Sequence, residues 1–134
     1  MHLKEDLHYI GDNDQHLYSV GEVCSLMHVT RKTLFYYDRI GLLKPTERAT
    51  SQQYKLYDAG QLNRLNQILI YRNAGLTIQE VRSILDDENS DHLKVMENAM
   101  ERLEKERKEK SDQIDRLQVL IEREKGDYQI HNLF

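Results

Sequence analysis

The stretch from residue 30 to residue 45, TRKTLFYYDRIGLLKP, decides the fold of this 134-residue chain. Thr30 can begin a helix, because its hydroxyl can accept a hydrogen bond from a backbone N–H of the first turn. The helix is predicted from Arg31 to about Ile40, and Gly41 ends it. The stretch therefore predicts a short helix that carries several long polar side chains.

A second short helix is predicted just before this one. Ser19 and Glu22 form an S-x-x-E capping box, which begins a helix that runs to about Met27. His28 and Val29 then turn the chain. Two short helices joined by so short a turn outline a helix-turn-helix. The apolar residues of the first helix recur at i, i+3, i+4 and i+7, as on one buried face: Val20, Val23, Cys24 and Met27.

A two-stranded ribbon and two further helices are predicted next. The alternation at 54–57 follows the polar loop 46–53 and predicts a short strand, so the ribbon would form the wing of a winged helix-turn-helix. Asp58 caps a third helix, which ends at Gly75, and Thr77 begins a fourth. Their inward residues are Leu62, Leu65, Ile68 and Leu69, then Ile78, Val81, Ile84 and Leu85.

The last predicted helix runs from about residue 91 to Lys125, with Gly126 as its C-cap. About 35 residues at 1.5 Å each span roughly 50 Å, which is too long for burial in so small a domain. Its a and d heptad positions are mostly apolar, which predicts a coiled coil. The predicted dimerisation residues are Leu93, Met96, Met100, Leu103, Ile114, Leu117 and Ile121.

The polar exceptions on this seam favour antiparallel pairing of two copies. Arg107 and Lys110 occupy a and d positions near the middle of the helix, and acids at 104, 106, 109 and 112 can neutralise them.

The predicted fold is mostly α, a winged helix-turn-helix DNA-binding domain with a long antiparallel coiled-coil dimerisation helix. The predicted domains are an extension (1–17), the winged helix-turn-helix (18–88), the dimerisation helix (89–126) and a tail (127–134).

Charge is distributed unevenly along the chain, which has a net charge of -4. Residues 18–85 hold nine Lys or Arg against five Asp or Glu, a net charge of +4, whereas residues 1–17 carry -3 and residues 86–134 carry -5. A basic segment between acidic flanks is expected where one region meets phosphates. The extension 1–17 has a weak helical pattern that fits either one or two helical turns or a disordered tail.

Composition and motifs argue against several other classes of protein. The chain is 31% charged and only 39% hydrophobic, which favours long solvated helices over an enzyme with a deep pocket. It shows no catalytic motif and no metal-ligand spacing among its six histidines, so no enzyme activity, cofactor or metal site is expected. Cys24 stands alone and is expected to be buried. With no bilayer-length apolar run and no signal peptide, a cytoplasmic protein is expected.

The candidate DNA-binding residues lie on the helix from Arg31 and on the wing. Early residues of such a helix can reach base edges in the major groove, and wing side chains can clamp phosphates. Since Leu34 and Tyr37 are three residues apart, one tyrosine of the pair 36–37 is expected to pack inward. The candidates are Ser19, Thr30, Arg31, Lys32, Thr33, Tyr36, Tyr37, Arg48, Tyr54, Lys55 and Arg72.

Four stretches together resemble the MerR family of bacterial transcription regulators: YSVGEV (18–23), TRKTLFYYDRIGLLKP (30–45), YKLY (54–57) and RNAGLTIQEV (72–81). The resemblance implies a dimer joined by an antiparallel coiled coil. It also implies binding to a pseudo-palindromic promoter spacer, which the protein bends and untwists for RNA polymerase. Phe35 stands where the family usually has arginine.

Residues 126–134 contain no cysteine, unlike the corresponding loop of the family's soft-metal sensors. Either the protein senses its signal by another route or a sensor region is missing from the chain.

The function predicted is a sequence-specific transcription regulator, with double-stranded promoter DNA, RNA polymerase and a second copy of the chain as partners. The alternative is an architectural or chromosome-organising protein that uses the same DNA-binding unit.

Overall fold

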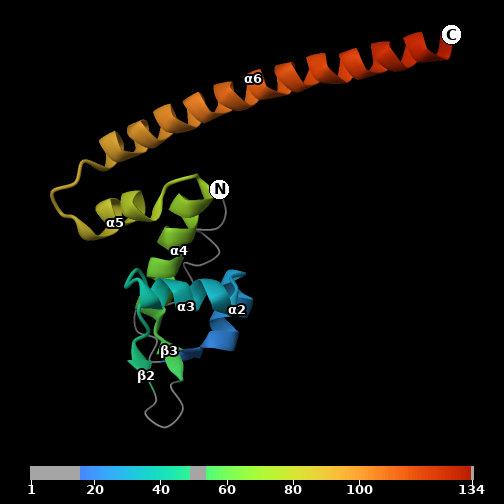
Figure 1. Cartoon of the computed structure of the whole chain (residues 1–134). Helices are drawn as coiled ribbons and strands as arrows, with labels where there is room; N and C mark the ends of the chain where they lie inside the picture. Colours follow the sequence, from blue (N-terminus) through green and yellow to red (C-terminus); the bar gives the residue numbers. More distant parts are fainter. Residues whose placement is uncertain (1–15, 49–53, 134) are drawn as a thin grey trace. The chain divides into compact units, whose positions relative to one another are not determined.

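The protein is predominantly helical and ends in one long helix (Figure 1). The computed structural model describes residues 16–48 and 54–133. The chain divides after Glu88 into two compact units. The first 15 residues, to which a weak helical pattern was assigned, lie outside the described residues.

The first unit contains the predicted helix-turn-helix, wing and two further helices, in the predicted order. Its elements are β1 (Tyr18–Ser19), α2 (Val20–Met27), α3 (Arg31–Arg39), β2 (Glu47–Arg48), β3 (Lys55–Tyr57), α4 (Ala59–Asn73) and α5 (Ile78–Asp86).

The helix starts of this unit follow from local side-chain chemistry. Capping boxes form at Ser19 and at Thr77, and the side chains of Thr30 and Asp58 each accept one backbone N–H. Each cap satisfies a backbone donor that the first helical turn leaves free. The four predicted caps are confirmed.

The sheet has three strands in the order β1-β3-β2, so the predicted two-stranded ribbon is incomplete. Both pairings are antiparallel, with Tyr18 opposite Tyr57 and Arg48 opposite Lys55. The strand β1 has only two residues, which is too short to show the alternation by which a strand is predicted. Its pairing joins the start of α2 to the wing.

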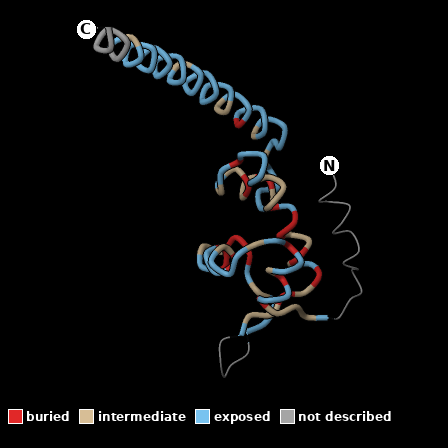
Figure 2. Tube along the Cα trace, turned by 90° about the vertical axis from the view of Figure 1, so that its right-hand side faces the viewer, coloured by how far each residue is buried: buried red, intermediate tan, exposed pale blue. Residues whose placement is uncertain are grey.

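The buried residues of the first unit, which are coloured red in Figure 2, come from its helices, from β3 and from the segment after α3. Cys24, which was expected to be buried, is only half-buried, and Leu69 is half-buried as well. The fully enclosed side chains of this unit are Val23, Leu34, Leu42, Leu43, Tyr57, Leu62, Leu65, Ile68 and Val81.

The second unit consists of α6, which runs from His92 to Leu133 over 42 residues. At 1.5 Å per residue the helix is about 63 Å long. The predicted end at Gly126 is wrong, because the helix continues through this residue. One glycine inside a helix costs only about 1 kcal/mol relative to alanine, which the surrounding turns can offset. Among the residues that the structure describes, no helix is both long enough and apolar enough to cross a bilayer.

Candidate nucleic-acid interface

Helix α3 presents its polar side chains to solvent and packs its apolar side against the core. Arg31, Lys32 and Tyr36 are exposed, whereas Leu34 is fully buried and Tyr37 is 6% exposed. The inward packing of one tyrosine is therefore confirmed, and the residue is Tyr37. Only Tyr36 of the pair offers its ring to a ligand on the exposed face of the helix.

Four candidate residues line one hollow of about 350 Å³ on the first unit: Ser19, Arg31, Tyr54 and Lys55. They come from the cap of α2, the first turn of α3 and the start of β3. Gly21 also lines the hollow, and a Cβ atom there would lie 3.5 Å from Nη2 of Arg31. Cationic, hydroxyl and aromatic groups thus converge on one concave surface, a combination suited to a phosphate backbone.

Asp38, which sequence reasoning did not select, ties the wing to α3. Its carboxylate accepts two hydrogen bonds from the guanidinium of Arg48, at 2.6 and 2.9 Å. It also pairs with Nζ of Lys55 at 2.9 Å. The Lys55 ammonium lies 4.1 Å from the ring centroid of Phe35, the residue that stands where the MerR resemblance expects arginine. The two wing cations therefore have partners within the first unit.

The charges around Asp38 favour its ionised form. The side chain is only 8% exposed, and burial alone would raise the pKa of the carboxyl. The hydrogen bonds from Arg48 outweigh burial, and together with Lys55 they lower the pKa of Asp38. The same contact raises the pKa of Arg48, so both partners remain charged. No pattern in the sequence marks this contact, because a single acid on an amphipathic helix is most often solvated.

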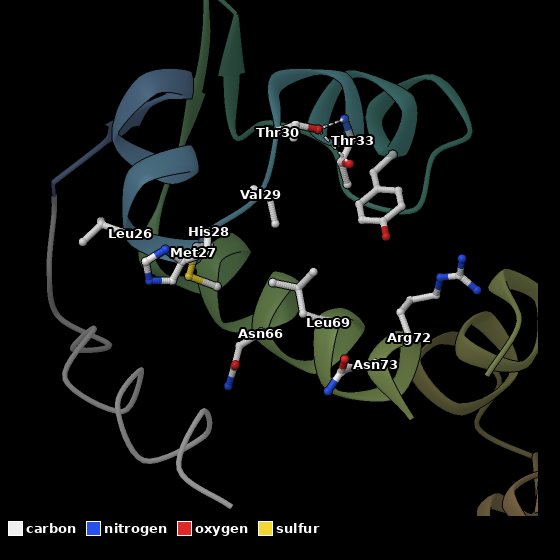
Figure 3. A pocket seen from close by; sticks show the side chains of 11 residues that line it. Leu26, Met27, His28, Val29, Thr30, Thr33, Asn66, Leu69, Arg72 and Asn73 are labelled. Carbon is white, nitrogen blue, oxygen red and sulfur yellow. Dashed lines mark hydrogen bonds between the residues drawn. The ribbon is translucent and has the colours of Figure 1, made fainter. Parts of the chain in front are cut away.

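A second hollow of about 640 Å³ lies beside the turn between α2 and α3 and along α4 (Figure 3). Thr30 and Thr33 line it, and the Thr30 hydroxyl accepts a hydrogen bond from Thr33 N at 3.1 Å. Arg72 also lines it and donates from Nη1 to the carbonyl oxygen of Leu76 at 2.7 Å. This contact joins the end of α4 to the loop before α5, so Arg72 has a structural role besides the proposed phosphate contact.

The turn beside this hollow contains the strained residue His28. It ends α2 in the left-handed region, with φ 56° and ψ 45°. A residue with a Cβ atom adopts that conformation at a cost, which the packing of the two helices must offset. The turn between α2 and α3 thus uses the left-handed conformation at a residue other than glycine.

Tyr57 is fully buried, and its hydroxyl has no hydrogen-bond partner among the described residues. Burial, with a smaller contribution from the charge of Asp38, raises the pKa of Tyr57 to about 12. The side chain therefore stays neutral at physiological pH, and it belongs to the core of the first unit.

Helix α6 exposes the apolar seam that the heptad pattern predicted. Six of the seven predicted dimerisation residues are exposed, and Leu103 is half-buried. Val119 and Leu120 are exposed as well, although they fall outside the a and d positions. Arg107 pairs with Glu104 of its own helix at 2.6 Å, as the neighbouring acids suggested.

No group of three or more His, Cys, Asp or Glu that could hold a metal ion occurs among residues 16–48 and 54–133.

A sequence model described as the MerR HTH family regulatory protein matches residues 18–88. Over 74 residues the chain is 47% identical to the HTH-type transcriptional activator TipA of Streptomyces coelicolor, covering 55% of this chain and 29% of TipA. Over 97 residues it is 33% identical to the transcriptional activator mta of Bacillus subtilis, covering 72% of this chain and 37% of mta. The chain thus spans well under half of the length of these relatives.

Two solved structures resemble the fold. One is EcmrR in an EcmrR–DNA complex within EcmrR-RPo, with a TM-score of 0.72 and 31% identity over 81% of this chain and 40% of that chain. The other is MtaN, the N-terminus of the Bacillus subtilis multidrug transporter activator. It has a TM-score of 0.66 and 30% identity over 78% of this chain and 97% of that chain.

Proposed function

The chain belongs to the MerR family of helix-turn-helix regulatory proteins, and from that premise we propose that it regulates transcription as a homodimer bound to specific promoter DNA. The observation that carries the proposal is the hollow on which Ser19, Arg31, Tyr54 and Lys55 converge. In a helix-turn-helix the start of the second helix enters the major groove. Arg31 is then in position to read base edges, and Ser19 and Tyr54 to hold the backbone.

The uncovered seam of α6 supports the homodimer. A row of exposed apolar side chains on a helix of about 63 Å is unfavourable in water, and a second copy can cover it. Antiparallel pairing centred near Arg107 would set Leu93 and Met96 of one copy against Ile121 and Leu117 of the other. Arg107 and Lys110 at the centre of the seam would then select one register of the two helices, as polar residues at seam positions do.

A dimer of this kind fits a pseudo-palindromic site, since each copy contributes one recognition helix. We propose that the site is a promoter spacer and that binding distorts it, so that RNA polymerase engages both promoter elements. The solved EcmrR–DNA complex within EcmrR-RPo supports DNA and RNA polymerase as partners. The names of TipA and mta as activators favour regulation over the architectural alternative.

In vitro selection from randomised DNA duplexes tests the proposal. The native chain should enrich an inverted repeat, with half-sites separated by about one helical turn or a multiple of it. Fluorescence energy transfer between dyes at the two ends of the selected duplex should report bending upon binding. Duplex binding without any enriched motif would favour the architectural alternative, and no duplex binding would overturn both functions.

A further inference from the structure

Two cations of the wing stand side by side with one carboxylate between them. Arg48 of β2 and Lys55 of β3 are directly opposed in the antiparallel register. Like charges in directly opposed positions destabilise a strand pair. Asp38 of α3 contacts both of them, at 2.6 Å to Arg48 and at 2.9 Å to Lys55. The carboxylate therefore offsets a repulsion that the pairing of the strands creates.

The contact joins the two parts of the molecule that would touch DNA. Asp38 lies on the same helix as Arg31, and its partners lie on the two strands of the wing. The bidentate geometry from Arg48 fixes direction as well as distance. Lys55 is 19% exposed and is held further by the ring of Phe35. The wing is thereby held at a fixed angle to the recognition helix.

We propose that Asp38 is a positioning residue for DNA recognition, which holds the wing against α3 so that both meet one DNA site in register. The inference rests on the DNA-binding function proposed above. In this arrangement Arg48 and Lys55 hold the wing through Asp38 and do not act as free phosphate ligands. The three side chains together carry a charge of only +1.

The proposal predicts opposite effects on specific and nonspecific DNA. Asp38→Asn removes one negative charge and releases two cations toward phosphates. Affinity for nonspecific duplex should therefore rise, and its salt dependence should steepen by about one for each cation that reaches a phosphate. Specific binding requires the fixed angle, and it should weaken. The ratio of specific to nonspecific affinity should fall roughly tenfold or more, the size of one lost base contact.

Asp86→Asn is the matched control. Asp86 forms an ion pair with Arg64 of the same unit at 2.8 Å. Replacing Asp86 by asparagine changes the net charge by the same amount as Asp38→Asn. Arg64 keeps its hydrogen bond to the carbonyl oxygen of Leu42, so the local structure should persist. This variant should raise affinity for both DNA types alike and leave the ratio unchanged.

Arg48→Gln provides a second variant in case Asp38→Asn unfolds. If Asp38 holds Arg48, specific affinity should fall while the salt dependence of nonspecific binding changes by much less than one. An equal loss on both DNA types, with a salt slope reduced by about one, would show Arg48 to be an ordinary phosphate ligand and would overturn the proposal.

The affinities are measured by fluorescence anisotropy, on the selected duplex and on a scrambled one, from about 50 to 200 mM salt. An unchanged ratio in folded Asp38→Asn would overturn the positioning role even if its melting temperature falls. Failure of the native chain to select any duplex would instead overturn the proposed function, so the two outcomes are distinguishable.

Discussion

The winged helix-turn-helix and the helix α6 differ in what covers their apolar side chains. In the first, residues such as Leu34, Leu62 and Ile68 are enclosed by neighbouring elements of the same chain. In α6, Leu93, Ile114 and other seam residues lie open to water. Burial contributes roughly 25 cal/mol per Å² of apolar surface, so the first unit gains this free energy from its own fold. The second would gain it for the seam residues in the proposed dimer.

Charged side chains show the same contrast. Asp38 in the first unit is nearly buried and accepts hydrogen bonds from two different strands. The ion pair between Arg107 and Glu104 on α6 lies within one helix, and the Arg107 side chain is 78% exposed. Exposed pairs of this kind contribute little to stability. Tertiary structure therefore fixes the first unit, whereas assembly is expected to fix α6.

The largest expected effect comes from Leu117→Asp, which places a charge in the proposed seam. A buried, unpaired carboxylate is strongly unfavourable, so the dimer should dissociate and binding to an inverted repeat should be lost. Sedimentation equilibrium measures the first effect and anisotropy the second. Val119→Asp is the matched control, since Val119 is equally apolar and exposed but lies outside the seam. A dimer that survives Leu117→Asp would contradict the heptad assignment.

A smaller effect of opposite sign is expected at the centre of the seam. Replacing Arg107 and Lys110 together by leucine should stabilise the dimer by about 1–4 kcal/mol, the range seen when buried ion pairs are replaced by well-packed apolar residues. The register should become less defined, because the polar layer no longer excludes other alignments. Thermal unfolding and sedimentation velocity measure these two consequences. A less stable dimer would show that the central cations have favourable partners across the interface.

Within the first unit, Arg31→Ala should affect recognition without affecting folding or assembly. The side chain is exposed at the start of α3, so its loss removes no core contact. If Arg31 reads a base edge, specific affinity should fall by about 1–3 kcal/mol, while nonspecific affinity changes little. Fluorescence anisotropy on the selected duplex and on a scrambled duplex measures the specific and the nonspecific affinity. Equal losses on both would assign Arg31 to the phosphate backbone.

The features that the sequence predicted are those that local chemistry determines. The caps at Ser19, Thr30 and Thr77 depend on side chains within three residues of the bonds they make. The helix α6 and its row of exposed apolar side chains depend only on the periodicity of one segment, and the pairing of that row with a second copy stays a prediction. Each of these follows from the order of residues along a short segment, whatever the rest of the chain does.

The features that were missed depend on contacts between distant segments. The strand β1 forms because Tyr18 and Ser19 meet β3, almost forty residues later in the chain. Asp38 lies ten residues before its partner Arg48 in the chain, and it becomes buried only when the wing folds over α3. Gly126 was assigned as a helix end from its residue type alone, and the turns on both sides of it outweighed that preference.

The smallest expected effect concerns Tyr57, and it tests how completely the first unit satisfies its own side chains. Its hydroxyl is buried with no partner among the described residues, so the folded state gives up a hydrogen bond to water without replacing it. Tyr57→Phe removes that penalty and keeps the ring, so the free energy of unfolding should rise by about 1 kcal/mol. Tyr54→Phe is the control, because Tyr54 is 61% exposed and its hydroxyl reaches water in both states. Chemical denaturation of the two variants at one protein concentration gives the comparison. A loss of stability in Tyr57→Phe would mean that an enclosed water molecule hydrates the hydroxyl, and the core of the first unit would then include that water.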